Sequence, residues 1–274
     1  MLTLEDLPND EVGAARLLID LRWPDGWRCV RCDHDKYSHL STRPRVTVCT
    51  RCLKQQSVTA GTPLHGCHVP LSKVLRAAFL LARKESISAR RLSTAIKVCH
   101  ETAWSLGHRL RSGLVFCDLQ LDALVSMAEL RLARRPPVGQ PWIRSHFLKV
   151  TVLWDESMRM VTLPGHVDPH AARRFVDRHS TAEKAAIRPW VPLWLASRFS
   201  RIFHGVHQGV SDRWMPFYAA ATAAWENAHR SKQDPAAVML RATLARTTHP
   251  FASVRPRLAP QRPDLRDWLV ADQR

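Results

Sequence analysis

Apolar residues recur with a helical period in several stretches of the chain. An apolar residue at every third or fourth position places those side chains on one face of an α-helix. This period predicts helices over residues 10–21, 71–82, 89–96, 100–112, 170–179, 211–230 and 235–247, and a partly helical segment over 195–209. Three predicted helices directly follow residues whose side-chain oxygens can cap the first turn: Asn9 or Asp10, Ser88, and Asp234.

Shorter stretches carry a strand-like pattern instead. β-Branched and aromatic residues between turn-forming clusters predict strands over residues 37–40, 46–49, 55–59, 123–125, 148–154 and 158–163. The whole pattern predicts an α+β fold built in pieces. From Pro250 onward the chain is rich in Pro and Arg, which predicts a loose basic tail.

The predicted helices 89–96 and 100–112 are separated only by Lys97, Val98 and Cys99. Two helices joined by so short a turn, with a basic outer face, are typical of a helix-turn-helix. An ordinary helical hairpin is the alternative. If Lys97 adopts a left-handed backbone in this turn, the misfit costs on the order of 1 kcal/mol.

Four of the seven cysteines form two CxxC pairs, Cys29 with Cys32 and Cys49 with Cys52, and 16 residues separate the pairs. Zn²⁺ prefers four thiolates at the corners of a tetrahedron, and one CxxC knuckle brings two of them onto the ion. The intervening span is about the length of a β-hairpin, so the two knuckles can meet. Because a four-cysteine site leaves no open position for water, we expect this zinc to be structural. Two disulfides or four unpaired thiols are the alternatives.

The chain of 274 residues carries 41 Lys and Arg against 24 Asp and Glu, a formal net charge of +17. So large a charge favours a polyanionic partner, and double-stranded DNA fits a helix-turn-helix. A compositional bias toward Arg is the alternative. Residues 1–21 do not form a signal peptide, and no apolar run reaches the roughly 18 residues that span a bilayer. We therefore expect a cytoplasmic protein with reduced thiols and no membrane partner.

Several motifs carry a family resemblance. The first are the four cysteines, the segment Arg22-Trp-Pro-Asp-Gly-Trp-Arg-Cys29, and Ser57-Val-Thr-Ala-Gly-Thr62 with His65-Gly66. They resemble the N-terminal zinc ribbon of bacterial insertion-sequence transposases of the DDE class (ISXO2-like). Three later segments resemble the helix-turn-helix that follows the ribbon in that family: Ile87-Ser-Ala89, Thr102-Ala-Trp104 and His108-Arg-Leu-Arg111. A later segment of the family is similar to His204-Gly205 with His207-Gln-Gly-Val-Ser211.

The resemblance implies an order of domains. An N-terminal helix over 1–22, a zinc ribbon over 23–66 and a helix-turn-helix DNA-binding region over 67–113 come first. A shortened, degenerate ribonuclease-H-like transposase region over 114–210 follows, then C-terminal helices over 211–250 and the basic tail over 251–274. The second helix would meet base edges at its start, and arginines would contact phosphates. The residues concerned are His100, Glu101, Thr102 and Ser105, and Arg90, Arg91, Arg109 and Arg111.

Members of that family cut and rejoin DNA with two divalent ions held by carboxylates. The sequence departs from this requirement at all three expected positions. Ala128 stands in place of the first Asp, the turn expected after residue 179 is missing, and Arg198 lies in the third motif, where it adds positive charge. Other carboxylates remain nearby, which we interpret as solvated: Glu129, Asp155, Glu156 and Asp168.

The sequence therefore predicts a transposase-family protein that binds insertion-sequence ends and is catalytically inactive. One alternative is an active DDE-type transposase with a metal site rebuilt from the remaining carboxylates, and only this alternative requires Mg²⁺. A decaying copy without a selected function is the other alternative. Besides DNA, the expected partners are a second copy of the chain or an intact relative transposase.

Overall fold

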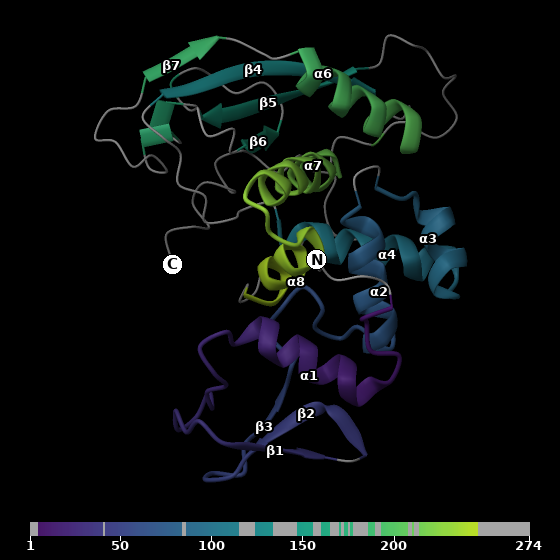
Figure 1. Cartoon of the computed structure of the whole chain (residues 1–274), viewed down its shortest axis with the longest axis vertical. Helices are drawn as coiled ribbons and strands as arrows, with labels where there is room; N and C mark the ends of the chain where they lie inside the picture. The colour runs from purple at the N-terminus through teal and green to yellow at the C-terminus, as the bar shows by residue number, and fades with distance from the viewer. Residues whose placement is uncertain are drawn as a thin grey trace, which may run out of the picture. The chain divides into compact units, whose positions relative to one another are not determined.

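The computed structural model describes residues 5–40, 42–83, 86–114, 124–133, 147–155, 160–164, 186–189, 193–207 and 214–245, with positions 170, 173, 174, 176, 177 and 210 (Figure 1). The chain divides into two compact units. The first comprises Met1–Leu114 and Lys232–Phe251, and the second comprises Val115–Ser231 and Ala252–Arg274. The first unit is thus discontinuous in sequence.

The first unit begins with helix α1, Glu11–Arg22. The N–H of Gly13 donates to the Asp10 carboxylate at 2.8 Å, which confirms Asp10 as the predicted cap. The same hydrogen bond is the main cause that lowers the pKa of Asp10. The buried face of the helix consists of Ala14, Ala15, Leu18, Ile19 and Leu21.

A three-stranded antiparallel sheet follows, formed by β1 (Tyr37–Leu40), β2 (Arg43–Cys49) and β3 (Gln55–Ser57) in that order. The three strands predicted in this region are confirmed. Strand β2 begins three residues before the predicted position 46, and β3 ends two residues before the predicted position 59. Thr47 is fully buried and its hydroxyl donates to the carbonyl of Gln56, so a polar side chain joins β2 to β3.

Three helices complete the continuous part of the first unit: α2 (Leu71–Leu81), α3 (Ala89–Ile96) and α4 (His100–Ser112). The Ser88 hydroxyl accepts from the N–H of Arg91, as the predicted cap requires. Lys97 ends α3 with φ 53° and ψ 62°, the left-handed conformation considered for it. Leu92, Ile96, Leu106 and Leu110 are buried where α3 and α4 pack together.

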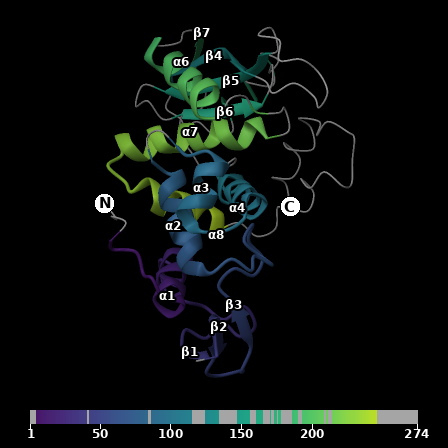
Figure 2. The same ribbon diagram turned by 90° about the vertical axis from the view of Figure 1, so that its right-hand side faces the viewer.

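Helix α8, Pro235–Ala245, returns to the first unit and packs against α1, α2 and α4 (Figures 1 and 2). Its buried apolar residues are Ala236, Met239, Leu240 and Leu244. The Thr243 hydroxyl donates to the Leu110 carbonyl at 3.0 Å. A Cβ on Gly113 would lie 2.5 Å from the Cα of Thr243. The backbone after α4 therefore approaches α8 too closely at Gly113 for any side chain.

This return differs from the sequence-based organisation, which placed residues 211–250 in one group of C-terminal helices. Helix α7, Met215–Arg230, belongs to the second unit, whereas α8 belongs to the first. The division falls at Ser231 and Lys232. The physical reason is that α8 has its own apolar face, which α1, α2 and α4 bury.

The second unit contains a mixed sheet of β4 (Leu124–Ala133), β5 (Phe147–Asp155), β6 (Met160–Pro164) and β7 (Ala186–Pro189). The strand order is β6-β5-β4-β7, with β7 parallel to β4 and the other pairs antiparallel. Helix α6 (Leu193–Ser200) contacts β4, the π-helix η1 (Arg201–Val206) follows it, and α7 packs on β6. Strand β4 runs much further than the predicted 123–125.

Some expectations lie outside the described residues. They are the basic tail at 251–274, the carboxylates of Glu156 and Asp168, and most of the segment between residues 178 and 192. In the part of the chain that the structure describes, no helix is long and apolar enough to cross a membrane.

Candidate zinc centre and nucleic-acid surface

The four cysteines of the two knuckles converge at one end of the small sheet. Their sulfur atoms all lie within 4.8 Å of one another. The Sγ atoms of Cys29 and Cys52 are 3.5 Å apart, and those of Cys32 and Cys49 are 3.6 Å apart. Four sulfurs at about 2.3 Å from a tetrahedral Zn²⁺ are separated by about 3.8 Å, so the arrangement fits the ion. A disulfide needs about 2.05 Å, and the cysteines are free thiols, so the disulfide alternative is wrong.

The two knuckles have the same backbone construction. The N–H of Asp33 donates to the Cys29 carbonyl, and the N–H of Leu53 donates to the Cys49 carbonyl, at 3.0 and 3.1 Å. Asp33 and Leu53 both have a left-handed backbone, with φ 55° and 57°. For a residue other than Gly, Asn or Asp this conformation costs roughly 1–2 kcal/mol, so the cost falls on Leu53. The repeated CxxC motif is therefore a repeated structure.

The sulfurs compete for negative charge. Burial opposes ionisation of Cys29, but the N–H groups of Arg31 and Cys32 and the neighbouring thiols lower its pKa to about 6. At Cys32 the N–H of His34 favours the thiolate, while burial and the other three sulfurs raise the pKa to about 12. One thiol thus ionises readily and another resists, as expected for four close thiols. A divalent cation bound to all four would stabilise every thiolate and remove this competition.

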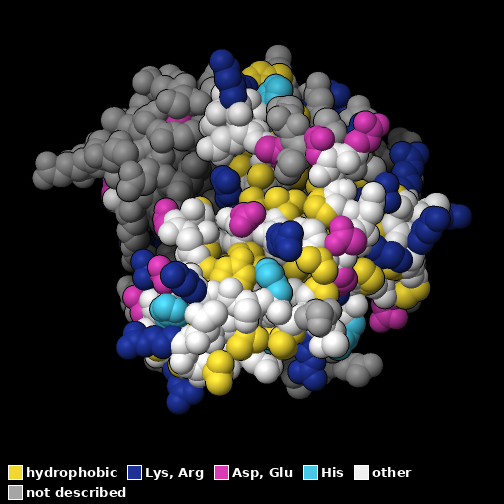
Figure 3. Space-filling view, turned by 60° about the horizontal axis from the view of Figure 1, so that its bottom comes forward, with side chains coloured by type: hydrophobic (Ala, Val, Ile, Leu, Met, Phe, Trp, Pro, Cys, Tyr) yellow, Lys and Arg dark blue, Asp and Glu magenta, His cyan; other side chains and the backbone are white. Residues whose placement is uncertain are grey.

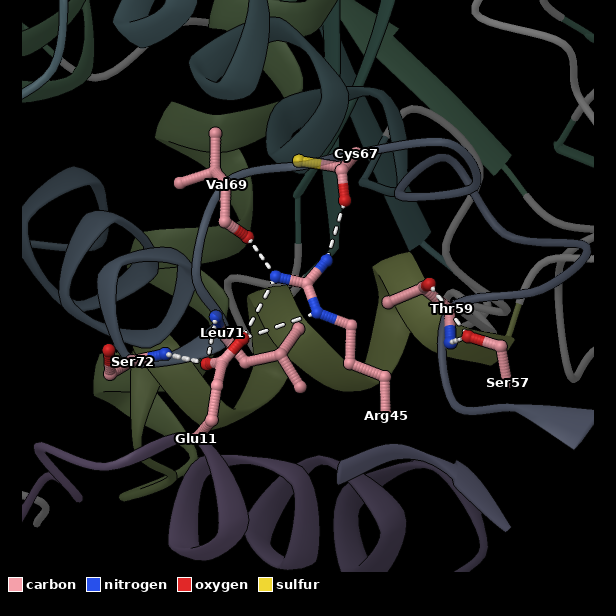
Figure 4. Close-up of polar contacts among 8 residues, drawn as sticks. All are labelled: Glu11, Arg45, Ser57, Thr59, Cys67, Val69, Leu71 and Ser72. Carbon is pink, nitrogen blue, oxygen red and sulfur yellow. Dashed lines mark hydrogen bonds and ion pairs between the residues drawn. The ribbon is translucent and has the colours of Figure 1, made fainter. Parts of the chain in front are cut away.

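An ion pair between α1 and β2 fixes the ribbon to the start of α2 (Figure 4). Arg45 donates to Glu11 Oε1 at 2.9 Å and to the carbonyls of Cys67 and Val69 at 2.7 and 2.6 Å. The other carboxylate oxygen of Glu11 accepts from the N–H of Leu71 at 2.6 Å. Because Pro70 provides no side-chain cap for α2, Glu11 performs that role from another helix.

Two further arginines hold the segment between the ribbon and α2. Arg22 at the end of α1 donates to the carbonyls of Val58 and Ala60 at 2.5 and 2.8 Å. Arg109 in α4 donates to the carbonyls of Pro63 and His65, both at 2.8 Å. The connecting segment has little regular structure, so these side chains satisfy carbonyls that a helix or sheet would otherwise pair.

The structure therefore gives Arg109 and Arg111 a different placement from the one the sequence predicted. Both were predicted to contact phosphates. The Arg109 guanidinium is engaged with backbone carbonyls inside the unit. Arg111 is only 4% exposed and cannot present its charge at the surface. The reason is that α4 faces the connecting segment and α8, which the sequence pattern did not reveal.

The other predicted DNA contacts lie at the starts of α3 and α4. Arg90, Arg91, His100 and Glu101 are exposed, whereas Thr102 and Ser105 are half-buried. Thr102 lies beside the thiol of Cys99, with 3.0 Å between Sγ and Oγ1. The hydroxyl and then the N–H of Thr102 lower the pKa of Cys99. Part of the hydrogen-bonding capacity of Thr102 is thus used within the helix start.

The second unit shows no cluster of metal-binding carboxylates among its described residues. Ala128 lies on the interior strand β4 opposite Val152. Asp155 at the end of β5 is 2% exposed, so the interpretation of Asp155 as a solvated carboxylate is wrong. Arg198 forms a buried ion pair with Glu226 and lies 4.0 Å from the ring centre of Trp225. Glu226 therefore offsets the positive charge that Arg198 adds.

Comparison with known proteins finds one match, which covers the first elements of the chain. Residues 9–55 match the family model of the transposase zinc-ribbon domain (IS1595). No curated protein and no solved structure matches the chain. The matched segment includes α1 and all four cysteines of the cluster and ends before α2. Residues 9–55 are thus similar to a transposase zinc ribbon of the IS1595 type, and this similarity supports a transposase of that family.

Proposed function

We propose that this chain is a transposase-family DNA-binding protein that recognises insertion-sequence ends through its zinc ribbon and a helix-turn-helix formed by α3 and α4. The match of residues 9–55 to a transposase zinc ribbon carries the proposal. The formal net charge of +17 supports a polyanionic partner. The short turn between α3 and α4 supports the proposal, because a turn of three or four residues joins the helices of such a DNA-binding pair.

Two kinds of contact are assigned to this pair of helices. Arg90 and Arg91, exposed in the first turn of α3, bind phosphates and set the affinity. His100, Glu101 and Ser105 lie in the first two turns of α4, where a recognition helix meets base edges. Arg109 is a positioning residue, because its hydrogen bonds join α4 to the segment that follows the ribbon.

We further infer that the second unit is a shortened ribonuclease-H-like region whose strand-transfer carboxylates are lost. Its mixed sheet with a parallel fourth strand and flanking helices supports this assignment. Two metal ions close together repel unless carboxylates neutralise them. Ala128 offers no ligand at the interior strand. Any residual activity would need Mg²⁺ bound through carboxylates such as Asp155, and such a protein would be the alternative, active transposase.

The partners follow from this function. Two copies of the chain bind side by side at transposon-like ends. Alternatively, one copy binds there together with an intact relative transposase and inhibits it. Both roles require the same DNA recognition, so DNA binding is the property to test first. A decaying copy would have no selected DNA site.

The test is selection of duplexes from a random pool by the zinc-loaded full chain. We expect one recurring sequence to be enriched. Affinity for that duplex should fall by orders of magnitude between roughly 50 and 200 mM salt, because each neutralised phosphate releases counterions. A flat salt response, or a pool without enrichment, would contradict the proposal.

Variants separate the roles of the residues. Arg90→Gln and Arg91→Gln should each weaken binding to all duplexes and reduce the salt slope by about one. Ser105→Ala should change the enriched sequence while the slope is retained. Arg16→Gln is the matched control, because it removes the same charge from the exposed side of α1 and should leave binding unchanged.

A further inference from the structure

The two zinc knuckles expose their apolar residues. Val30 is 71% exposed and Leu53 is 72% exposed, more than any other large hydrophobic residue that the structure describes. Each of them directly follows a cysteine of the cluster, and the sulfurs of those two cysteines, Cys29 and Cys52, are 3.5 Å apart. Val30 and Leu53 are therefore each bonded to a cysteine of the same pair of neighbouring sulfurs.

Leu53 occupies a backbone position that its residue type does not favour. The first knuckle has Asp33 at the equivalent position, and both residues are left-handed, with φ 55° and 57°. Asp, Asn and Gly accept this conformation more readily than a bulky apolar residue. Leu53 gains no burial in return. An unfavourable conformation combined with exposure indicates a side chain that is presented for contact.

Cations flank the two apolar residues. Arg31 follows Val30, Arg51 precedes Cys52, and Lys54 follows Leu53, and all three cations are exposed. Arg28 lies 3.9 Å from Asp33. Because both side chains are mostly exposed to water, this ion pair is weak and leaves the Arg28 charge accessible to a partner. The space-filling view with the ribbon end turned forward shows hydrophobic side chains interspersed with Lys and Arg and with some Asp and Glu (Figure 3).

We propose that the knuckle tip, defined as Val30, Arg31, Arg51, Leu53 and Lys54, binds the minor groove of DNA and inserts Leu53 as an apolar wedge between base pairs. Minor-groove proteins combine these same elements: cations that follow the narrow groove and an aliphatic side chain that unstacks one step and bends the duplex. A protein partner is disfavoured because charged residues as a class are depleted at the cores of protein interfaces, whereas three of the five tip residues are cations. The inference rests on the proposed DNA-binding function and adds a contact separate from α3 and α4.

The test uses the full chain and the duplex enriched by selection, labelled at both ends so that energy transfer reports bending. Leu53→Asn removes the apolar side chain, keeps the charge and suits the left-handed backbone. Zinc content and thermal midpoint should therefore be retained or rise. Affinity should fall by roughly tenfold or more, as for the loss of one buried leucine, and the bend should decrease. The salt slope should stay unchanged, whereas Arg51→Gln should reduce it by about one.

The control variant is Val12→Asn, which removes another exposed apolar side chain, 40% exposed on α1, and should leave both affinity and bend unchanged. If the wild-type chain enriches no duplex, the proposed function itself fails. If the wild type binds and Leu53→Asn binds and bends the duplex equally, the wedge is refuted and DNA binding stands. Loss of self-association by Leu53→Asn without loss of bending would assign the tip to a protein contact and also refute the wedge.

Discussion

Replacement of Glu11 by Ala tests whether one carboxylate couples the ribbon to the helices. Its Oε2 accepts from the N–H of Leu71 at 2.6 Å and so caps a helix that lacks its own cap. Loss of a cap costs typically ~1 kcal/mol. Its Oε1 pairs with Arg45 at 2.9 Å, with side-chain exposures of 25% and 32% for Arg45 and Glu11. A partly exposed pair of this kind contributes up to about 1 kcal/mol, which gives a total of ~2 kcal/mol for Glu11→Ala.

The measurement is urea unfolding of the zinc-loaded chain, together with amide hydrogen exchange of the peptide that begins at Leu71. We expect the unfolding midpoint to fall and exchange at the start of α2 to accelerate, while zinc stays bound, because no cysteine is involved. A cycle with Arg45→Ala should give a coupling energy of ~1 kcal/mol. Asp20→Ala removes a carboxylate from the exposed side of the same helix and should have little effect.

The outcome that refutes this reasoning is specific. If Glu11→Ala lowers the free energy of unfolding by less than ~0.5 kcal/mol, the value typical of surface substitutions, and exchange at Leu71 is unaltered, then Glu11 does not cap α2. The ribbon would then be held without this cap, through the hydrogen bonds that Arg22, Arg45 and Arg109 donate to carbonyls.

Three further predictions concern the metal, the packing of α8 and catalysis. Cys49→Ser, or a strong chelator, should remove zinc and unfold the ribbon, because metal binding and folding are one equilibrium here; stoichiometric zinc in that variant by elemental analysis would contradict this. Gly113→Ala places a Cβ 2.5 Å from the Cα of Thr243 and should destabilise the first unit by roughly 1–3 kcal/mol in calorimetry, whereas an unchanged midpoint would show that α8 is not seated there. Neither the wild type nor Asp155→Ala should nick end-containing DNA with Mg²⁺ or Mn²⁺, and nicking by the wild type that Asp155→Ala abolishes would reveal a rebuilt catalytic site.

Local chemistry made much of the first unit predictable. The cap at Asp10, the cap at Ser88 and the left-handed turn at Lys97 each depend on a few neighbouring residues, and all three agree with the structure. The zinc cluster was predictable for the same reason, because two residues between cysteines fix the knuckle whatever surrounds it.

Tertiary placement of charged residues was not predictable in this way. Arg45, Arg109 and Arg111 look like surface cations in the sequence, yet they bind carbonyls, pair with a carboxylate or are buried. No local pattern distinguishes such an arginine from a solvated one, because its acceptors are backbone groups of distant residues. Strand β4 is a different case. The alternation of Glu129 and Arg131 with Leu130 and Leu132 is a period-two signal for the second half of this strand, which the prediction of 123–125 left out.

The return of α8 joins two parts of the first unit that lie far apart in the sequence. A ribosome that has made α1 through α4 has not yet made Leu240 and Leu244, which α8 buries in the first unit. Domains assemble as they emerge, but this unit must wait for almost the whole chain. A frameshift or premature stop after residue 114 would leave an apolar seam open on an otherwise complete zinc and helix region. Loss of α8 alone would therefore destabilise a unit whose zinc cluster and other helices lie more than 100 residues earlier in the sequence.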